Sequence, residues 1–169
     1  MKRILGILCL LILGAAVISA AEAPKPKNWT PPPYKIYAQA LSDEIKASHP
    51  ELLSVTFHGV PPGLHDVYTM FAGSYPDRIG NPDDDDDIMI TKLGITIIDP
   101  RWHRKDAIKK FVMMLPLREA SGESVGLLVL AYKLDPTKSE KDYYADSTAL
   151  RDSLEQKIPS YAALYEAAK

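Results

Sequence analysis

The chain has 169 residues, of which 46% are hydrophobic, with 20 basic and 22 acidic side chains. This length is sufficient for one domain with a substantial core. Because the charge is nearly balanced and no run of lysine or arginine forms a basic face, nucleic acid is excluded as the expected partner.

The N-terminus has the pattern of a secretory signal peptide. Basic Lys2 and Arg3 precede an apolar run, and cleavage after Ala21 would place Ser19 and Ala21 at the two small-residue positions. The alternative is an uncleaved membrane anchor, although the run is shorter than the roughly 20 residues that a spanning helix needs. We therefore expect residues 1–21 to be removed and the protein to be periplasmic or secreted. The mature chain keeps 18 basic and 22 acidic side chains, a net charge of −4.

The rest of the chain divides into a short tether and one domain. Residues 22–33, E-A-P-K-P-K-N-W-T-P-P-P, are a proline-rich tether. We expect residues 34–169 to form a single domain without internal repeats. The only cysteine, Cys9, lies in the signal segment, so the mature domain has no disulfide and depends on its core.

The first predicted element is a long helix that opens near Thr30, where prolines suit the first turn. It ends at His49-Pro50. Its apolar stripe recurs at helical spacing and consists of Tyr34, Tyr37, Ala38, Leu41 and Ile45. Residues 52–58 and 67–72 follow as two strands joined by a turn, because both are rich in β-branched and aromatic residues.

Residues 73–90 are the least regular part of the sequence and contain five consecutive aspartates, Asp83 to Asp87. A proline followed by acidic residues suits the first turn of a short helix, where carboxylates meet the positive end of the helix dipole. Residues 95–98 are the next predicted strand.

Residues 111–117 and 125–132 are two apolar strands joined by a polar link, which predicts a β-hairpin. Both strands are apolar on both faces, so the hairpin should lie in the middle of the sheet and be covered on each side. We expect Phe111, Met113 and Leu115 on one face and Val112, Met114 and Leu117 on the other. Met114 and Leu128 are expected to be opposed residues of the two strands.

The final helix is predicted from the capping box Ser139-x-x-Asp142. Its buried face is expected to contain Tyr143, Ser147, Leu150, Leu154 and Ile158. Pro159 should interrupt this helix, and residues 161–168 are expected to add further turns.

This order of elements resembles the PAS-type fold, and the long leading helix is similar to that of extracytoplasmic Cache (PDC) sensor domains. The resemblance covers Tyr34 to Ile158. It is carried by three segments: H-G-V-P-P at 58–62, D-R-I-G-N-P-D at 77–83, and M-L-P-L-R at 114–118 together with G-E-S-V-G at 122–126. It implies an α+β fold whose five-stranded antiparallel sheet is accompanied by a long N-terminal helix and a C-terminal helix.

The resemblance also implies a small ligand between the sheet and the loops that follow the second strand. The candidate ligand-binding residues are His58, Tyr68, Met70, Arg78 and Arg118. His58 ends the first strand at the expected pocket mouth, and the guanidinium of Arg118 has the geometry to hold a carboxylate. The alternatives are a hydrogen-bonded rim histidine and an ordinary turn arginine. No metal or cofactor is expected.

Three motifs suggest chemistry but fit it poorly. Gly122 to Gly126 matches the nucleophile elbow G-x-S-x-G, yet strands are predicted on both sides and all four histidines precede Ser124, which favours a hairpin turn. A helix-loop-helix calcium site needs glycine at loop position six and glutamate at position twelve. A loop that starts at Asn81 has Asp86 and Lys92 there, and one that starts at Asp83 has Ile88 and Gly94, so the acidic run fits neither. An irregular cation site there stays open. So does a metal site of His58, His65 and Asp66, with His103 as a further ligand.

The leading hypothesis is therefore a non-enzymatic exported sensor or binding domain of PAS/Cache type. It would bind a small polar molecule and act through a membrane or envelope protein, since receptors of this family carry a second span and a signalling module that this sequence does not contain. The alternative is a protein-interaction module of the cell envelope without a ligand. A metal-dependent hydrolase is the third. A cavity of mixed polarity would favour the sensor, and an exposed apolar patch the interaction module.

Overall fold

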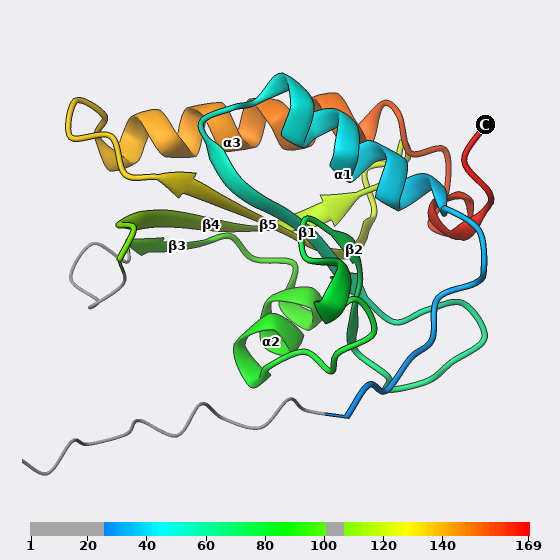
Figure 1. Cartoon of the computed structure of the whole chain (residues 1–169). Coiled ribbons are helices and arrows are strands. Elements are labelled where there is room, and N and C mark those ends of the chain that lie inside the picture. Colours follow the sequence, from blue (N-terminus) through cyan, green and yellow to red (C-terminus); the bar gives the residue numbers. More distant parts are fainter. Residues whose placement is uncertain (1–25, 101–106) are drawn as a thin grey trace, which may run out of the picture.

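The computed structural model describes residues 26–100 and 107–169 (Figure 1). Its core element is one antiparallel sheet in the strand order β2-β1-β5-β4-β3. The strands are β1 (Leu52–Gly59), β2 (Thr69–Gly73), β3 (Ile97–Pro100), β4 (Lys110–Arg118) and β5 (Ser124–Lys133). The helices are α1 (Tyr37–Ser48), α2 (Asp85–Leu93) and α3 (Glu140–Glu155), with short 3₁₀ turns η1 (Pro76–Arg78) and η3 (Ala162–Tyr165). The predicted α+β class and element order are confirmed.

Two layers of helix enclose the sheet. Helices α1 and α3 lie on one face and α2 lies on the other (Figure 1). The predicted signal peptide, the beginning of the tether and His103 lie outside the described residues. Within 26–100 and 107–169, no helix has the length and apolar character needed to cross a bilayer.

The β4–β5 hairpin occupies the middle of the sheet, as predicted, because β5 pairs with both β1 and β4. The predicted opposition of Met114 and Leu128 is wrong by one residue: Leu128 pairs with Leu115, and Met114 pairs with Val129. The assignment of Leu117 to the face of Met114 is also wrong. Alternation continues through Pro116, so Leu117 joins Leu115 in the main core.

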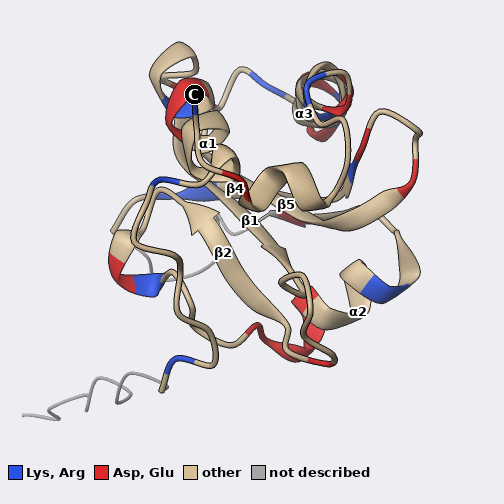
Figure 2. Ribbon diagram, turned by 90° about the vertical axis from the view of Figure 1, so that its right-hand side faces the viewer, with Lys and Arg blue, Asp and Glu red and all other residues tan. Residues whose placement is uncertain are grey.

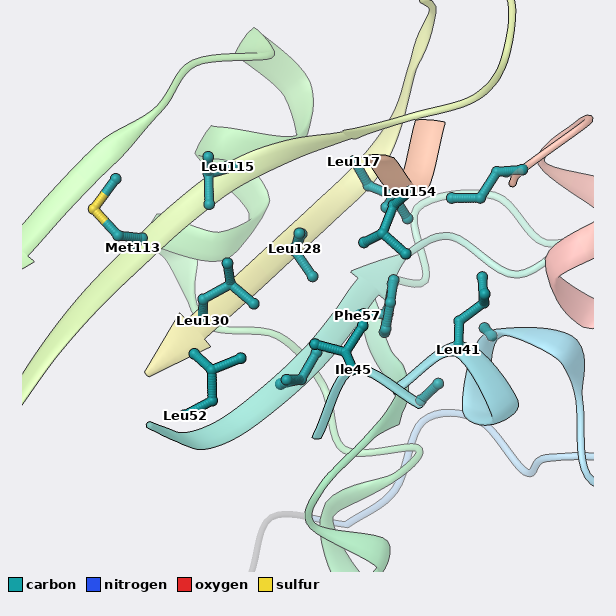
Figure 3. Close-up of a cluster of buried hydrophobic side chains, with 14 of the residues drawn as sticks. Leu41, Ile45, Leu52, Phe57, Met113, Leu115, Leu117, Leu128, Leu130 and Leu154 are labelled. Carbon is teal, nitrogen blue, oxygen red and sulfur yellow. The ribbon is translucent and has the colours of Figure 1, made fainter. Parts of the chain in front are cut away.

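The main core lies between the sheet and helices α1 and α3 (Figure 3). Phe57 of β1, Leu115 of β4 and Leu128 of β5 meet there in one layer, facing Leu41 and Leu154 of the helices. A second and smaller cluster lies on the α2 side and consists of Ile90, Val112, Met114, Leu127 and Ala131. The hairpin is therefore buried on both faces, as its unbroken apolar sequence required.

Helix α1 begins at Tyr37, so the predicted start near Thr30 is wrong. Three consecutive prolines at 31–33 favour an extended backbone instead. Tyr34 consequently lies outside the apolar stripe and is exposed. The described part of the predicted tether contacts the domain. The backbone N–H of Asn28 donates to the Gly80 carbonyl at 2.8 Å, and the ring of Trp29 packs edge-on against the ring of Tyr165.

Helix α3 begins with the predicted capping box. The backbone N–H of Asp142 donates to Ser139 Oγ, and the backbone N–H of Ser139 donates to the Asp142 carboxylate at 2.8 Å. After α3, the expected turns at 161–168 reduce to the single 3₁₀ turn η3.

Replacing the cap residue in Ser139→Ala should lower the free energy of unfolding by about 1 kcal/mol, because the N–H of Asp142 loses its side-chain acceptor. Urea unfolding followed by circular dichroism measures this loss. Ser153→Ala is the matched control within the same helix, since Ser153 is exposed and bonds only a carbonyl of its own turn; it should cost less than about 0.5 kcal/mol. Equal midpoints for the two variants would contradict the capping role.

Candidate functional site

A cavity of about 170 Å³ lies on the α2 side of the sheet. Five elements or their flanks contribute to it: β1, β4, β5, η1 and the start of α2. Its lining residues are Ser54, Thr56, His58, Tyr75, Arg78, Asp84, Asp86, Asp87, Lys110, Val112, Met114, Val129 and Ala131. Apolar side chains from the central hairpin and charged side chains from η1, α2 and β4 thus meet in one hollow.

The alternation of β1 explains the polar side of this cavity. Val55 and Phe57 point into the main core, whereas Ser54, Thr56 and His58 point to the α2 side. Polar residues at every second position of a buried strand require polar partners. Thr56 and His58 bond each other, and His58 also meets Asp83, just before helix α2, and Asp87 in its first turn. Acidic residues gather at this end of α2 (Figure 2).

His58 is the centre of a buried polar cluster. Its Nδ1 lies 2.7 Å from Asp83 Oδ1 and 3.9 Å from Asp87 Oδ2, and its Nε2 lies 2.8 Å from Thr56 Oγ1. The side chains of His58 and Asp83 are only 6% and 1% exposed. The second oxygen of Asp83, Oδ2, is buried and has no hydrogen-bond partner among the described residues.

Local backbone pairing delivers Asp83 to His58. Residues 80–83 run along β2: the backbone N–H of Asp83 donates to the Tyr68 carbonyl at 3.1 Å, and Thr69 forms an antiparallel bridge with Pro82. Helix α2 begins directly afterwards, so Asp87 lies one turn beyond Asp83 on the same side.

Burial raises the pKa of the Asp87 carboxyl above its ordinary value. The electrostatic interaction with His58 opposes this shift, whereas the neighbouring carboxylates of Asp83 and Asp86 raise the pKa of Asp87 further. The site therefore concentrates negative charge where solvent cannot disperse it.

The structure brings together two of the five predicted ligand contacts, since His58 and Arg78 both line the cavity. Tyr68 lies beneath the Lys92 ammonium, 5.2 Å from its ring centroid, and Met70 is buried in β2. Arg118 is the last residue of β4, and its Nη1 donates to the Gly122 carbonyl of the following turn at 2.7 Å. Neither Tyr68, Met70 nor Arg118 lines the cavity. As ligand contacts, all five residues stay predictions.

Sequence reasoning missed Thr56, Asp87 and Lys110 as members of the same site. The alternating polar residues of β1 were a usable signal for Thr56. No local signal marked Lys110. It lines the cavity because the sheet order places β4 beside β5, which in turn lies beside β1.

The competing motifs separate in space. Ser124 begins β5 after a hairpin turn, so the strand–turn–helix of a nucleophile elbow is not formed and the hairpin interpretation is confirmed. The metal site of His58, His65 and Asp66, which the sequence left open, is not formed among the described residues. His65 and Asp66 lie in an exposed turn, and in the described part of the chain neither belongs to a group of side chains close enough to share an ion.

A larger hollow of about 460 Å³ lies between α1 and the C-terminal residues. Two of its charged side chains, Glu44 and Lys157, already form an ion pair at 2.6 Å. The α2-side cavity, with its buried histidine and carboxylates, is the better candidate site.

No protein-family model and no curated protein matches this chain. Among solved structures, it is similar to the type II free methionine-R-sulfoxide reductase from Thermoplasma acidophilum, with a TM-score of 0.51 and 14% identity over 76% of this chain and 92% of that chain. A putative GAF sensor protein from Burkholderia vietnamiensis has a TM-score of 0.49 and 14% identity over 74% and 76% of the two chains. The sensor domain of E. coli DcuS has a TM-score of 0.40 and 14% identity over 68% and 71%. Identities this low concern the fold alone, and that fold is α+β with a five-stranded antiparallel sheet.

Proposed function

We propose that the mature chain is an exported sensor or binding domain of PAS/Cache type, which binds a small polar molecule in the α2-side cavity. The observation that carries the proposal is the lining of this cavity, where charged groups of both signs surround an apolar floor from the central hairpin. A few convergent polar groups over an apolar surface are typical of small-molecule sites.

The lining favours a small zwitterion, such as an amino acid, over a purely apolar ligand. Arg78 and Lys110 supply positive charge for a carboxylate, and Asp84 and Asp86 supply negative charge for an amine. Within the described residues, no carboxylate forms an ion pair with Arg78 or Lys110, so both cations are available to a ligand. The ring of Tyr75, 5.4 Å from the Arg78 guanidinium, helps to orient it.

We further propose that residues 1–21 direct export, that residues 22–33 are a tether, and that residues 34–169 act as one sensor domain. Signalling would then pass to a membrane or envelope protein. The secretory pattern of the N-terminus supports this arrangement.

A thermal-shift screen of the mature chain against amino acids, carboxylates and amines tests the proposal. A genuine ligand at one hundred times its dissociation constant should stabilise the fold by about 2.7 kcal/mol. Arg78→Ala should abolish the shift. Arg118→Ala separates the cavity from the predicted contacts outside it, because Arg118 does not line the cavity, and a ligand bound in the cavity should keep its full shift in this variant. If no compound raises the midpoint, or if only the Arg118 variant loses binding, the cavity is not the ligand site.

A second candidate function, a protein-interaction module, is supported by the exposed apolar residues between α2 and the edge strand β3. Met89, Leu93, Ile95 and Ile98 are all exposed, and Leu93 retains 63% of its accessible surface. A photo-crosslinking residue at position 93 should capture one envelope protein in intact cells. The same residue at Leu64, which is exposed in a distant turn, should not. Identical crosslinks from both positions would contradict a specific interface.

A further inference from the structure

We propose that His58, Asp83 and Asp87 form a binding site for a divalent first-row transition-metal cation. One ligand atom from each residue lies within 4.8 Å of the others, which is close enough for all three to reach a single ion. The metal site does not depend on the proposed small molecule, because these three side chains supply the coordinating atoms by themselves.

The hydrogen bond between His58 and Thr56 prepares the imidazole for this role. Metal binding requires the ring to donate its Nε2 proton to Thr56 Oγ1, 2.8 Å away. The lone pair of Nδ1 then faces the cation, which takes the place of the proton that Nδ1 otherwise shares with Asp83 Oδ1 at 2.7 Å. Metal-binding histidines are commonly fixed in this way by a hydrogen bond from the other ring nitrogen. Thr56 is thus a positioning residue for the metal ligand.

The unpartnered oxygen of Asp83 is independent evidence for a cation. Its carboxylate is 1% exposed, yet Oδ2 has no hydrogen-bond partner among the described residues. A buried anionic oxygen without a partner is costly, and metal coordination is one of the few ways to satisfy it. With Asp87 beside it and the imidazole neutral, the cluster carries two negative charges that a divalent cation balances.

The ligand types select the class of metal. One imidazole nitrogen and two carboxylates suit zinc, manganese, iron or cobalt, whereas calcium and magnesium prefer oxygen ligands alone. Three protein ligands leave coordination positions open. His58 and Asp87 line the cavity whereas Asp83 does not, so these open positions are reached from the cavity side.

The exposed triplet Asp84, Asp86 and Asp87 is the competing location for an ion. It consists only of carboxylates at the N-cap and first turn of α2, two of them exposed, and it includes no buried ligand atom without a partner. Substitutions distinguish the two locations, because only Asp87 belongs to both.

The test is metal titration of untagged mature protein that has been stripped with a chelator. Zn²⁺ should bind with one equivalent by calorimetry, and Co²⁺ should give a visible absorption band that Zn²⁺ removes and equimolar Ca²⁺ does not. His58→Ala and Asp83→Asn should abolish both signals. Thr56→Val should weaken binding by about 10- to 100-fold and shift the cobalt band, as expected for a residue that orients a ligand.

His65→Ala is the matched control, since His65 is exposed and lies outside both sites, and it should bind Zn²⁺ as the parent does. Asp86→Asn removes a member of the competing triplet only, so stoichiometric Zn²⁺ binding should survive it. Asp87→Asn, which affects a partly exposed ligand, keeps the test decisive if a buried substitution prevents folding; circular dichroism identifies that case. Absence of stoichiometric binding in the parent overturns the proposal, as does loss of binding in Asp86→Asn but not in His58→Ala. The metal titration contains no organic compound, so a negative result in it does not bear on the small-molecule proposal, which the thermal-shift screen tests separately.

Discussion

Leu128→Asp should abolish cooperative folding of the mature chain. Leu128 is fully buried in the central strand, where it pairs with Phe57 on one side and Leu115 on the other. An aspartate there would place an unpaired charge among apolar side chains, at a cost of several kcal/mol. Since whole domains are stable by only about 5–15 kcal/mol, this single change removes most of the free energy of unfolding.

Urea unfolding of three variants separates charge from cavity formation. Leu128→Ala should remain folded but lose about 2–5 kcal/mol, as expected for a core leucine truncated to alanine. Glu123→Asp, in the exposed hairpin turn, should cost less than about 0.5 kcal/mol. A Leu128→Asp protein that unfolds at the parent's midpoint would show that the hairpin is not the centre of the core.

The hairpin shows what the sequence could predict and where that prediction stopped. Two apolar strands without alternation require cover on both faces, and this physical requirement correctly placed β4 and β5 in mid-sheet. Their register was one residue off, because it depends on the geometry of the connecting turn and on the irregularity beside Leu117 and Arg118. Apolar patterning identifies a buried strand but does not fix which residue opposes which.

The start of α1 illustrates a different limit. A capping residue followed by proline predicts a helix, and three prolines in succession predict an extended segment. Both signals were present near Thr30, and the structure follows the second. Here the tertiary contacts of Asn28 and Trp29 agree with the extended backbone.

Of the residues that line the candidate site, the sequence predicted only His58 and Arg78. His58 was identified from its position at the end of a strand, but its partner Asp83 comes from the acidic run 25 residues later. The two meet because residues 80–83 run along β2, a long-range pairing without a local sequence signal. Arg118 was chosen by the same strand-end argument, but it ends β4 away from the cavity and bonds the hairpin turn instead.

The two faces of the sheet have different tasks. The α1/α3 face contains most of the core, whereas the α2 face has a smaller apolar cluster and gives the remaining space to polar and charged groups. Stability and binding nevertheless share β5, because its consecutive residues point to opposite faces of the sheet: Leu128 lies in the main core and Val129 lines the cavity. Backbone changes in β5 should therefore affect both.

Gly126 is the position where this coupling is most direct. It lies in β5 opposite Leu117, and a Cβ added to it would overlap the backbone carbonyl oxygen of His58. A backbone atom cannot move aside as the end of a flexible side chain does, so β1 must shift at the residue that anchors the polar cluster. The backbone of Gly126 is not left-handed, which means that the steric overlap alone requires glycine here.

Gly126→Ala should therefore lower the free energy of unfolding by about 1–3 kcal/mol, the range for overpacked cores, and should also displace the His58 ring. Gly63→Ala is the matched control: an added Cβ there meets nothing within 4 Å, but its φ of 81° is unfavourable for alanine, at a cost of about 1 kcal/mol. The imidazole resonances of His58 distinguish the two variants, because they should move in Gly126→Ala and stay in place in Gly63→Ala. Unchanged His58 resonances in Gly126→Ala would mean that β5 yields instead of β1, and that the close approach of the two strands does not position the site.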